Sequence, residues 1–400
     1  MPLRADESLT APTLRRALIA GARRVIAGRD GLNRINVFPV ADGDTGNNMA
    51  STLGSVLNGA LSQRSRHAGE LLSRVGDDAI DGARGNSGAI LAQFLHGVAE
   101  RVKTLPSLDA QSLSEAVRHG AASARLALAK PVEGTIVSVI SAFAEELERN
   151  TDPTGDRGSR VGFARALVRA RRALADTPTQ LAVLQKAGVV DAGAKGFVDM
   201  LEGIAEFIEG GPRAIRLHGM PVTAANESHE IVVHDHAVDP QRRWCSECLL
   251  LGGELDRERL RIALEAAGAD SIVIAGGSSR LRVHAHAASP QEVFDACAEL
   301  GVVEAMKADD MLRQQRSAAS GLRVAIVTDS AADLPDAIAE RHAIAVVPVR
   351  VDLDGREYMD KIGLTTHEFY RRMAQSQQLP RTSQPPPGDF SRQFELALAH

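Results

Sequence analysis

The chain has 400 residues, too many for one hydrophobic core, so we expect two or three domains. A formal net charge of −5 and an aromatic content of 3% argue against a nucleic-acid partner, which would favour a basic face and stacking side chains. The first residues lack the apolar run of a signal peptide, no stretch approaches a membrane span, and three cysteines give no disulfide framework. We therefore expect a cytoplasmic protein.

Helical periodicity dominates the first half of the chain, and loops rich in Gly, Pro, Asp and Thr separate the periodic segments. No convincing strand interrupts this half, so we expect residues 1–212 to form an all-helical domain. The predicted helices span residues 10–29, 49–61, 71–80, 87–102, 113–129, 135–147, 161–174 and 194–208.

Two aspartates, Asp42 and Asp44, are one residue apart in the loop before the second predicted helix. Carboxylates this close repel each other unless a cation lies between them. Hard oxygen ligands suit Mg²⁺, which keeps coordination sites for phosphate oxygens. The flanking Gly43 and Gly46 permit a tight backbone path that turns both side chains toward one point. The alternative is a solvated Asp-Gly hairpin turn.

Three further segments have residue types that suit a phosphate site. Gly85-Asn86-Ser87-Gly88 leads into a helix, whose first N–H groups and positive dipole end can hold phosphate oxygens; the alternative is a glycine-rich helix start without a ligand. Thr135 can bond phosphate or cap its helix. Asp191 can orient a ribose or a metal-bound water, or be an ordinary turn aspartate. The sequence has no G-x-x-x-x-G-K-[ST] loop, so metal and backbone must meet the phosphate charge.

In this order, residues 36–49, 82–88, 131–136 and 188–196 resemble the nucleotide-site signatures of the fatty acid kinase family, relatives of the L subunit of dihydroxyacetone kinase. The resemblance implies an antiparallel helix barrel (DhaL-like, DAK2) that binds ATP at one end. It also implies that Asp42 and Asp44 carry Mg²⁺ with help from Asn36. Where the dihydroxyacetone kinase relative has a third aspartate, Asn36 is the nearest candidate here, which leaves the number of ions open. The other residues implied to bind the nucleotide are Thr45, Asn47, Asn48, Gly85, Asn86, Ser87, Gly88, Thr135 and Asp191.

Beyond a predicted linker at residues 213–229, strands and helices alternate. The order is βαββαβ, typical of a split βαβ sandwich. This small α+β domain, residues 230–318, resembles the middle domain of the same kinase family. Its predicted strands and helices span residues 243–251, 256–267, 271–275, 280–287, 290–300 and 302–306.

A zinc site is predicted in this middle domain. His284 and His286 project from one face of a strand, and Cys245 lies on another strand that can run alongside. Thiolate and imidazole ligands suit Zn²⁺ with an open fourth position, and the family resemblance implies matching ligands. Cys248 should point to the opposite face. The alternatives are a solvated His-x-His pair, a small core cysteine, or the rival pair His234 and His236.

In the last segment, residues 321–400, the runs 346–349, 358–360 and 381–390 resemble the start of the DegV family, whose members bind fatty acids and carry the acyl chain for these kinases. The α/β pattern starts with predicted strands at residues 323–327 and 345–351. The resemblance implies a lipid head-group site with Thr382 and Ser383, to which we add Asp329 and Ser330. The alternative for the hydroxyl pair is a Ser/Thr turn. A DegV-like domain should extend past His400, so we expect a fragment of a longer fusion or a truncated gene.

The family resemblance, together with the Asp42–Asp44 and glycine motifs, implies an ATP- and Mg²⁺-dependent kinase that phosphorylates a fatty-acid carboxylate to an acyl phosphate. Expected partners are a fatty acid, a separate DegV-type carrier or a membrane acyltransferase, and a second copy in a homodimer, with peripheral membrane association. One alternative is a dihydroxyacetone (glycerone)-type kinase for a small ketone or polyol. The other is a non-catalytic, nucleotide-dependent lipid-binding regulator.

Overall fold

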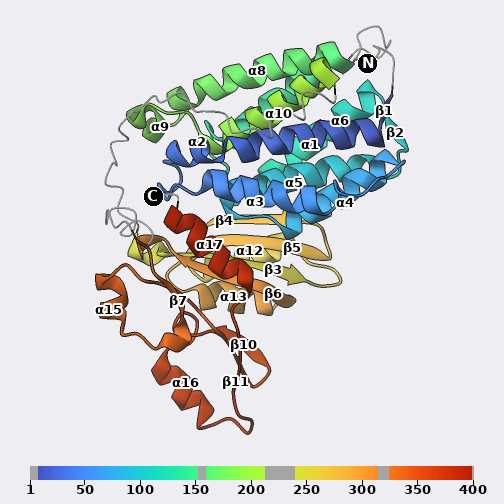
Figure 1. The fold of residues 1–400 in the computed structure, drawn as a ribbon. Coiled ribbons are helices and arrows are strands. Elements are labelled where there is room, and N and C mark those ends of the chain that lie inside the picture. The colour runs from blue at the N-terminus through green and yellow to red at the C-terminus, as the bar shows by residue number, and fades with distance from the viewer. Residues whose placement is uncertain (1–7, 152–158, 212–238, 314–323, 399–400) are drawn as a thin grey trace. The chain divides into compact units, whose positions relative to one another are not determined.

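The computed structural model describes residues 8–151, 159–211, 239–313 and 324–398 (Figure 1). The chain divides into two compact units. The first comprises Met1–His236, Leu251–Arg257 and Ser271–His284, and the second comprises Ala237–Leu250, Glu258–Asp270 and Ala285–His400. The predicted linker and the pair His234 and His236 lie outside the described residues.

Helices make up most of the first unit, as the periodicity predicts. They are α1 (Ala11–Ala27), α2 (Arg29–Arg34), α3 (Thr45–Asn58), α4 (Ala68–Asp81), α5 (Gly85–Val102), α6 (Ala110–Leu126), α7 (Ile136–Arg149), α8 (Ser159–Gln180), α9 (Ala182–Ala187) and α10 (Ala192–Gly210). The short α2 and α9 were not predicted. Nor was an antiparallel ladder of two-residue strands, β1 (Leu9–Thr10) and β2 (Ser107–Leu108). None of the helices that the structure describes is long and apolar enough to span a bilayer.

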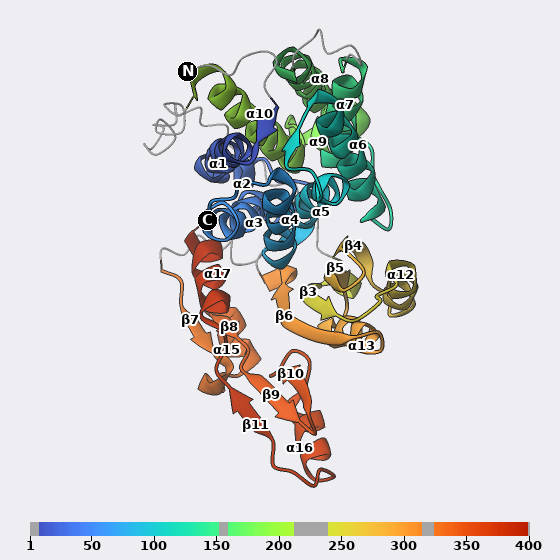
Figure 2. The ribbon, with the colours of Figure 1, turned by 90° about the vertical axis from the view of Figure 1, so that its right-hand side faces the viewer.

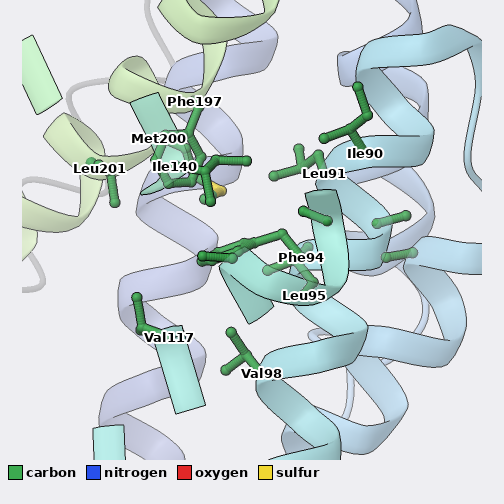
Figure 3. Packing of buried hydrophobic residues seen from close by; sticks show 14 of the residues in the cluster. Ile90, Leu91, Phe94, Leu95, Val98, Val117, Ile140, Phe197, Met200 and Leu201 are labelled. Carbon is green, nitrogen blue, oxygen red and sulfur yellow. The ribbon is translucent and has the colours of Figure 1, made fainter. Parts of the chain in front are cut away.

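Contacts between these helices follow a closed succession. Each of α1, α3, α4, α5, α6, α7, α8 and α10 packs on the next, and α10 packs on α1 (Figures 1 and 2). The most deeply buried helix is α5, because apolar and small residues occur around its whole circumference. Phe94 of α5 meets Phe197 of α10 edge to face, with ring centroids 5.4 Å apart, and Ile140 of α7 packs in the same cluster (Figure 3). The helical character of this unit is confirmed, while the closed barrel stays a prediction.

The predicted βαββαβ order is confirmed in the middle of the chain. Its elements are β3 (Trp244–Leu251), α12 (Arg257–Ala266), β4 (Asp270–Gly276), β5 (Arg280–Ala287), α13 (Pro290–Ala298) and β6 (Val302–Asp310), preceded by the 3-10 helix η2 (Pro240–Arg242). The strands are hydrogen-bonded in the order β4-β5-β3-β6. Each helical crossover therefore joins strands that have another strand between them, which is the split arrangement.

The C-terminal part has short strands and helices. They are β7 (Val327–Asp329), η3 (Ser330–Ala332), α15 (Asp336–Arg341), β8 (Ala345–Val347), β9 (Arg350–Leu353), β10 (Arg356–Met359), α16 (Thr366–Met373), β11 (Arg381–Ser383) and α17 (Pro387–Leu398). A parallel β7-β8 pair and a β10-β9-β11 sheet result.

Both strands predicted for this part need correction. The first begins at Val327, after the exposed Val324 and Ile326, and Arg323 lies outside the described residues. The second is divided into β8 and β9 around Pro348, because proline has no N–H to donate to a ladder.

Candidate functional site

The Asp42–Asp44 loop is held by the side chain of Asn36, which is buried. Its Oδ1 accepts a hydrogen bond from the backbone N–H of Thr45 at 2.9 Å and another from the Thr45 hydroxyl, and its Nδ2 donates to the Val40 carbonyl at 2.7 Å. The amide of Asn36 thereby caps the start of α3. The structure uses Asn36 to shape the loop, and its predicted part in Mg²⁺ binding stays a prediction.

At the start of α3, Asp44 is buried and oriented by an asparagine one turn later. Its Oδ1 accepts a hydrogen bond from Nδ2 of Asn48 at 2.7 Å. Asp42 is half-buried two residues earlier, in the same turn, where Gly43 has a positive φ of 67°. Asn47 is half-buried, and its N–H donates to Asn33 Oδ1. The predicted Mg²⁺ carboxylates thus lie at the positive end of a helix, where negative charge is favoured.

The predicted phosphate segment forms the first turn of α5, against α3. Gly85 has a φ of 57°, and a Cβ there would lie 2.2 Å from Asn48 Nδ2. Only glycine permits this backbone and this approach. Thr52 completes the contact, since its hydroxyl donates to the Asn48 carbonyl at 2.8 Å and accepts from the Arg84 N–H at 3.2 Å. Thr52 was not predicted; the signal that the sequence carries is a hydroxyl residue one helical turn after Asn48.

Two more helices start at the same place. A Cβ on Gly193, in the first turn of α10, would lie 2.8 Å from Ser87 Oγ and 3.4 Å from Ile136 Cβ. Ser87 belongs to the first turn of α5, and Ile136 is the first residue of α7. The structure therefore brings together the starts of α5, α7 and α10, and Gly85 joins α3 to the group. Helix starts that share one place combine their N–H groups and dipoles into a site for an anion.

Asp191 caps α10 rather than lying in an open turn. It is buried, its Oδ1 accepts from the Ala194 N–H at 2.7 Å, and it also accepts from the backbone of Ile136. Burial raises the pKa of Asp191 to about 6, and the two backbone hydrogen bonds oppose that rise. Asp191 thus joins the starts of α10 and α7, while its predicted contact with a nucleotide stays a prediction.

Thr135 precedes α7 and is buried. Its hydroxyl donates to the Val132 carbonyl at 2.7 Å, so it neither caps the helix nor points its proton toward the α5 turn. Of the two roles that the sequence left open, the cap is therefore not made. The structure uses Thr135 to close the loop before α7.

The three predicted zinc ligands lie together. Cys245 of β3 and His284 and His286 of β5 are buried, and each offers a ligand atom within 4.8 Å of those of the other two. Burial, with the carboxylates of Glu247 and Asp309 nearby, raises the pKa of the Cys245 thiol. Cys248 faces the other way, as predicted, with its sulfur 3.7 Å from Cys297 of α13. A thiolate and two imidazoles form a donor set that suits Zn²⁺.

The predicted lipid residues lie around the start of β9. Ser330 is buried and its hydroxyl accepts from the Val349 N–H at 3.0 Å, while Ser383 of β11 pairs in register with Arg350. Thr382 and Ser383 are exposed on β11. Asp329 Oδ1 accepts from the Ala331 N–H at 3.1 Å and so starts η3. Thr382 and Ser383 thus lie in a strand rather than in the turn that the sequence offered as the alternative. The lipid role of all four residues stays a prediction.

Three family models match successive parts of the chain. Residues 39–206 match the DAK2 domain, residues 241–318 match the middle domain of the fatty acid kinase (FakA-like) family, and residues 323–400 match the DegV family of uncharacterised proteins. The chain has a fatty acid kinase-like domain architecture. The predicted resemblance is thereby confirmed for all three parts, while the predicted domain limits stay predictions.

Several staphylococcal proteins are similar to this chain. An uncharacterized protein of Staphylococcus haemolyticus is 32% identical over 313 residues, which cover 75% of this chain and 54% of the relative. An uncharacterized protein of Staphylococcus aureus is 30% identical over 311 residues, covering 75% and 55%. The chain thus spans about half the length of the curated relatives it matches.

Among solved structures, the crystal structure of the dihydroxyacetone kinase from C. freundii in complex with AMP-PNP and Mg²⁺ is 17% identical. The superposed region covers 52% of this chain and 36% of the dihydroxyacetone kinase chain, with a TM-score of 0.37. A likeness this weak carries no argument for the site. The family matches alone support a kinase-related, phosphotransferase-type function.

Proposed function

We propose that this chain is an ATP- and Mg²⁺-dependent phosphotransferase that converts a fatty-acid carboxylate into an acyl phosphate. The observation that carries the proposal is the meeting of the starts of α3, α5, α7 and α10 next to Asp42 and Asp44. Phosphoryl transfer requires little covalent help from a protein, since positioning and charge neutralisation lower most of the barrier. Backbone amides at helix starts and a carboxylate-held cation supply both.

Each group has a defined task in this proposal. Asp42 and Asp44 would hold Mg²⁺, and the bound cation would neutralise part of the phosphate charge. Asn48 orients Asp44, and the first turn of α5 donates N–H groups to the phosphates. The substrate carboxylate is ionised near neutral pH, so the reaction needs no general base. A carboxylate oxygen forms a bond to the γ-phosphorus as the bond to the β-phosphate oxygen breaks, and ADP leaves.

We also propose that Cys245, His284 and His286 bind Zn²⁺ in a structural or regulatory role. Their soft donor atoms and mutual distances support this assignment, and no contact links them to phosphoryl transfer among the described residues. The DegV-type part would present the acyl chain, and covalent fusion would raise its effective concentration at the kinase. A separate DegV-type carrier, a membrane acyltransferase and a second copy of the chain are the proposed partners.

In the test, the purified chain and a separate DegV-type carrier are incubated with ATP, Mg²⁺ and a long-chain fatty acid. Hydroxylamine then traps any acyl phosphate. Asp42→Ala and Asp44→Ala should each lower the rate of acyl phosphate formation more than about 100-fold. Loss of a residue that only supports a metal ligand usually costs less than this. Asp44→Asn is the matched variant, because it can still accept the hydrogen bond from Asn48 but removes the charge. It should be as inactive as Asp44→Ala.

Other outcomes distinguish the alternatives. Phosphorylation of dihydroxyacetone without any acyl hydroxamate would favour a glycerone-type kinase. Nucleotide binding without turnover of either substrate would favour a regulator that binds lipid. An Asp44→Asn variant with full activity would contradict the proposed metal site even if the acyl phosphate forms.

A further inference from the structure

The β4–β5 hairpin is built into the helical unit, although it lies far beyond α10 in the chain. Val273 and Ala275 of β4 belong to the same buried apolar cluster as the core of the helices. Both residues are fully buried. The hairpin is therefore part of the packing of this unit, and what it touches there decides what it can do.

One set of contacts flanks the Gly82–Gly88 segment on both sides. Before it, the last residue of α4, Asp81, accepts hydrogen bonds from Arg280 Nη1 at 2.9 and 2.8 Å. After it, Gln93 of α5 is 2% exposed, and its Oε1 accepts from the Gly276 N–H at 2.5 Å. Arg280 starts β5 and Gly276 ends β4. The hairpin turn thus contacts the residue just before the predicted phosphate segment and a buried residue of α5 after it.

A second set of contacts lies just before the loop that leads to Thr135. Leu128 forms an antiparallel bridge with Val273 of β4. The Ile274 N–H donates to the Ala127 carbonyl at 2.8 Å, and the Ala129 N–H donates to the Ile272 carbonyl at 3.2 Å. The chain after α6 therefore adds to the edge of β4 as a short extra strand, just before the next predicted site segment.

The turn geometry requires glycine and fixes Arg280 relative to Gln93. Gly276 has a φ of 124°, and a Cβ there would lie 2.2 Å from the Arg280 carbonyl oxygen. The Gly277 N–H donates to the same carbonyl at 3.0 Å. The turn is therefore tight, and a shift of Arg280 would also displace Gly276, which donates to Gln93.

The charge of Arg280 also matters, because several carboxylates lie at the end of α4. Asp77 and Asp78 lie within electrostatic range of Asp81 at the end of α4, where the helix dipole is also negative. Such a negative cluster repels a phosphate bound at the next helix start. The Arg280 guanidinium offsets it.

We propose that the β4–β5 hairpin positions residues 82–88 and 127–135 of the nucleotide site, with Arg280 and Gln93 as its positioning residues. The inference rests on the proposed function for the identity of the ligand. It assigns to two strands of the middle domain a task in the helical domain. Arg280 touches neither substrate nor metal in this proposal and acts through Asp81.

The test measures ATP·Mg²⁺ binding by calorimetry and hydrogen exchange of residues 82–90 and 127–135 in the nucleotide-free chain. Arg280→Glu should weaken binding roughly fivefold or more, since it removes an exposed ion pair and adds a like charge. It should also speed exchange in both segments. The double variant Asp81→Arg with Arg280→Asp restores the pair with reversed charges and should recover slow exchange.

Arg101→Ala is the matched control. Arg101 pairs with Glu115 at 2.6 Å, is similarly exposed and lies at the other end of α5. If Arg280→Glu gives the binding and exchange of Arg101→Ala, the inference is overturned. If the wild-type chain binds no nucleotide, the proposed function fails. Exchange then decides the inference alone: faster exchange of residues 82–90 in Arg280→Glu supports positioning, and unchanged exchange overturns it.

Discussion

The two candidate sites are built in different ways. At the starts of α3, α5, α7 and α10, the backbone of four helices is brought together. The side chains of Asn36 and Asp191 bond to that backbone, and Asn48 bonds to Asp44. In the β3–β5 pair, three side chains converge directly. The first site depends on how closely helices approach, and the second depends on strand register.

This difference predicts what each site tolerates. A backbone site should be sensitive to any Cβ that separates the helices, whereas a side-chain site should be sensitive only to its ligand atoms. Strand neighbours fix the direction of alternate side chains, so a single ligand can be removed with little change around it. Substitutions at the two sites can therefore break or sharpen the comparison.

The largest effect is expected from removal of a ligand in the strand cluster. Cys245→Ala should abolish stoichiometric Zn²⁺ binding, because two imidazoles alone do not complete a zinc site. The measurement is metal content after dialysis against trace zinc. Cys297→Ala is the control: it removes a buried thiol that contacts Cys248 on the other side of the sheet, and it should retain the metal. Zinc retained in Cys245→Ala would show that the cluster is not the metal site.

The sequence could predict that these three side chains lie together, because the signal is local. His284 and His286 are two residues apart on a strand, and alternation alone places them on one face. The pairing of β5 with β3 followed from the βαββαβ order. Asp42 and Asp44 were predicted for the same reason, since both lie in one turn.

A second prediction concerns the helix starts. Gly85→Ala would put a Cβ 2.2 Å from Asn48 Nδ2 at a positive φ, so Asn48 and then Asp44 must move. We expect the free energy of unfolding to fall by about 3 kcal/mol, from backbone strain and the lost fit. Nucleotide affinity should fall at least tenfold. Denaturant unfolding and nucleotide titration measure the two effects.

Gly54→Ala is the matched control for Gly85→Ala. Gly54 lies inside α3, and a Cβ there meets nothing within 4 Å. It should stabilise the chain by about 0.5–1 kcal/mol, because alanine loses less backbone entropy in a helix. Equal effects of the two substitutions would contradict a site built from close helix approach.

The sequence could not predict how distant segments meet. Gln93 looks like any polar residue in a helix, yet it is buried and bonded to Gly276, 183 residues away. Its partner comes from packing between elements, which neither composition nor periodicity encodes.

The smallest effect is expected from the charge of Asp191. Its pKa of about 6 lies above the ordinary value of 3.8, because burial disfavours the carboxylate. The folded state therefore binds a proton more tightly than the unfolded state. The stability from this proton is fully present below pH 4 and is lost as the pH rises through 6. Asp191→Asn removes this titration but keeps an amide oxygen that can accept from the Ala194 N–H.

The free energy of unfolding of the wild-type chain minus that of Asp191→Asn should therefore fall by about 1–3 kcal/mol between pH 4 and pH 7, at 1.36 kcal/mol per pKa unit. Urea unfolding of both chains at each pH measures it.

The control should be an aspartate whose pKa is shifted the other way. Asp199→Asn is unsuitable, because Asp199 pairs with Lys195. Asp109→Asn serves better: Asp109 is the exposed cap of α6, and hydrogen bonds from Ser112 lower its pKa. For Asp109→Asn, the free energy of unfolding of the wild-type chain minus that of the variant should rise with pH rather than fall, and at lower pH. If the difference in the free energy of unfolding for Asp191→Asn does not change with pH, the prediction is wrong. The positive charge at the helix starts would then compensate for the burial of the Asp191 carboxylate.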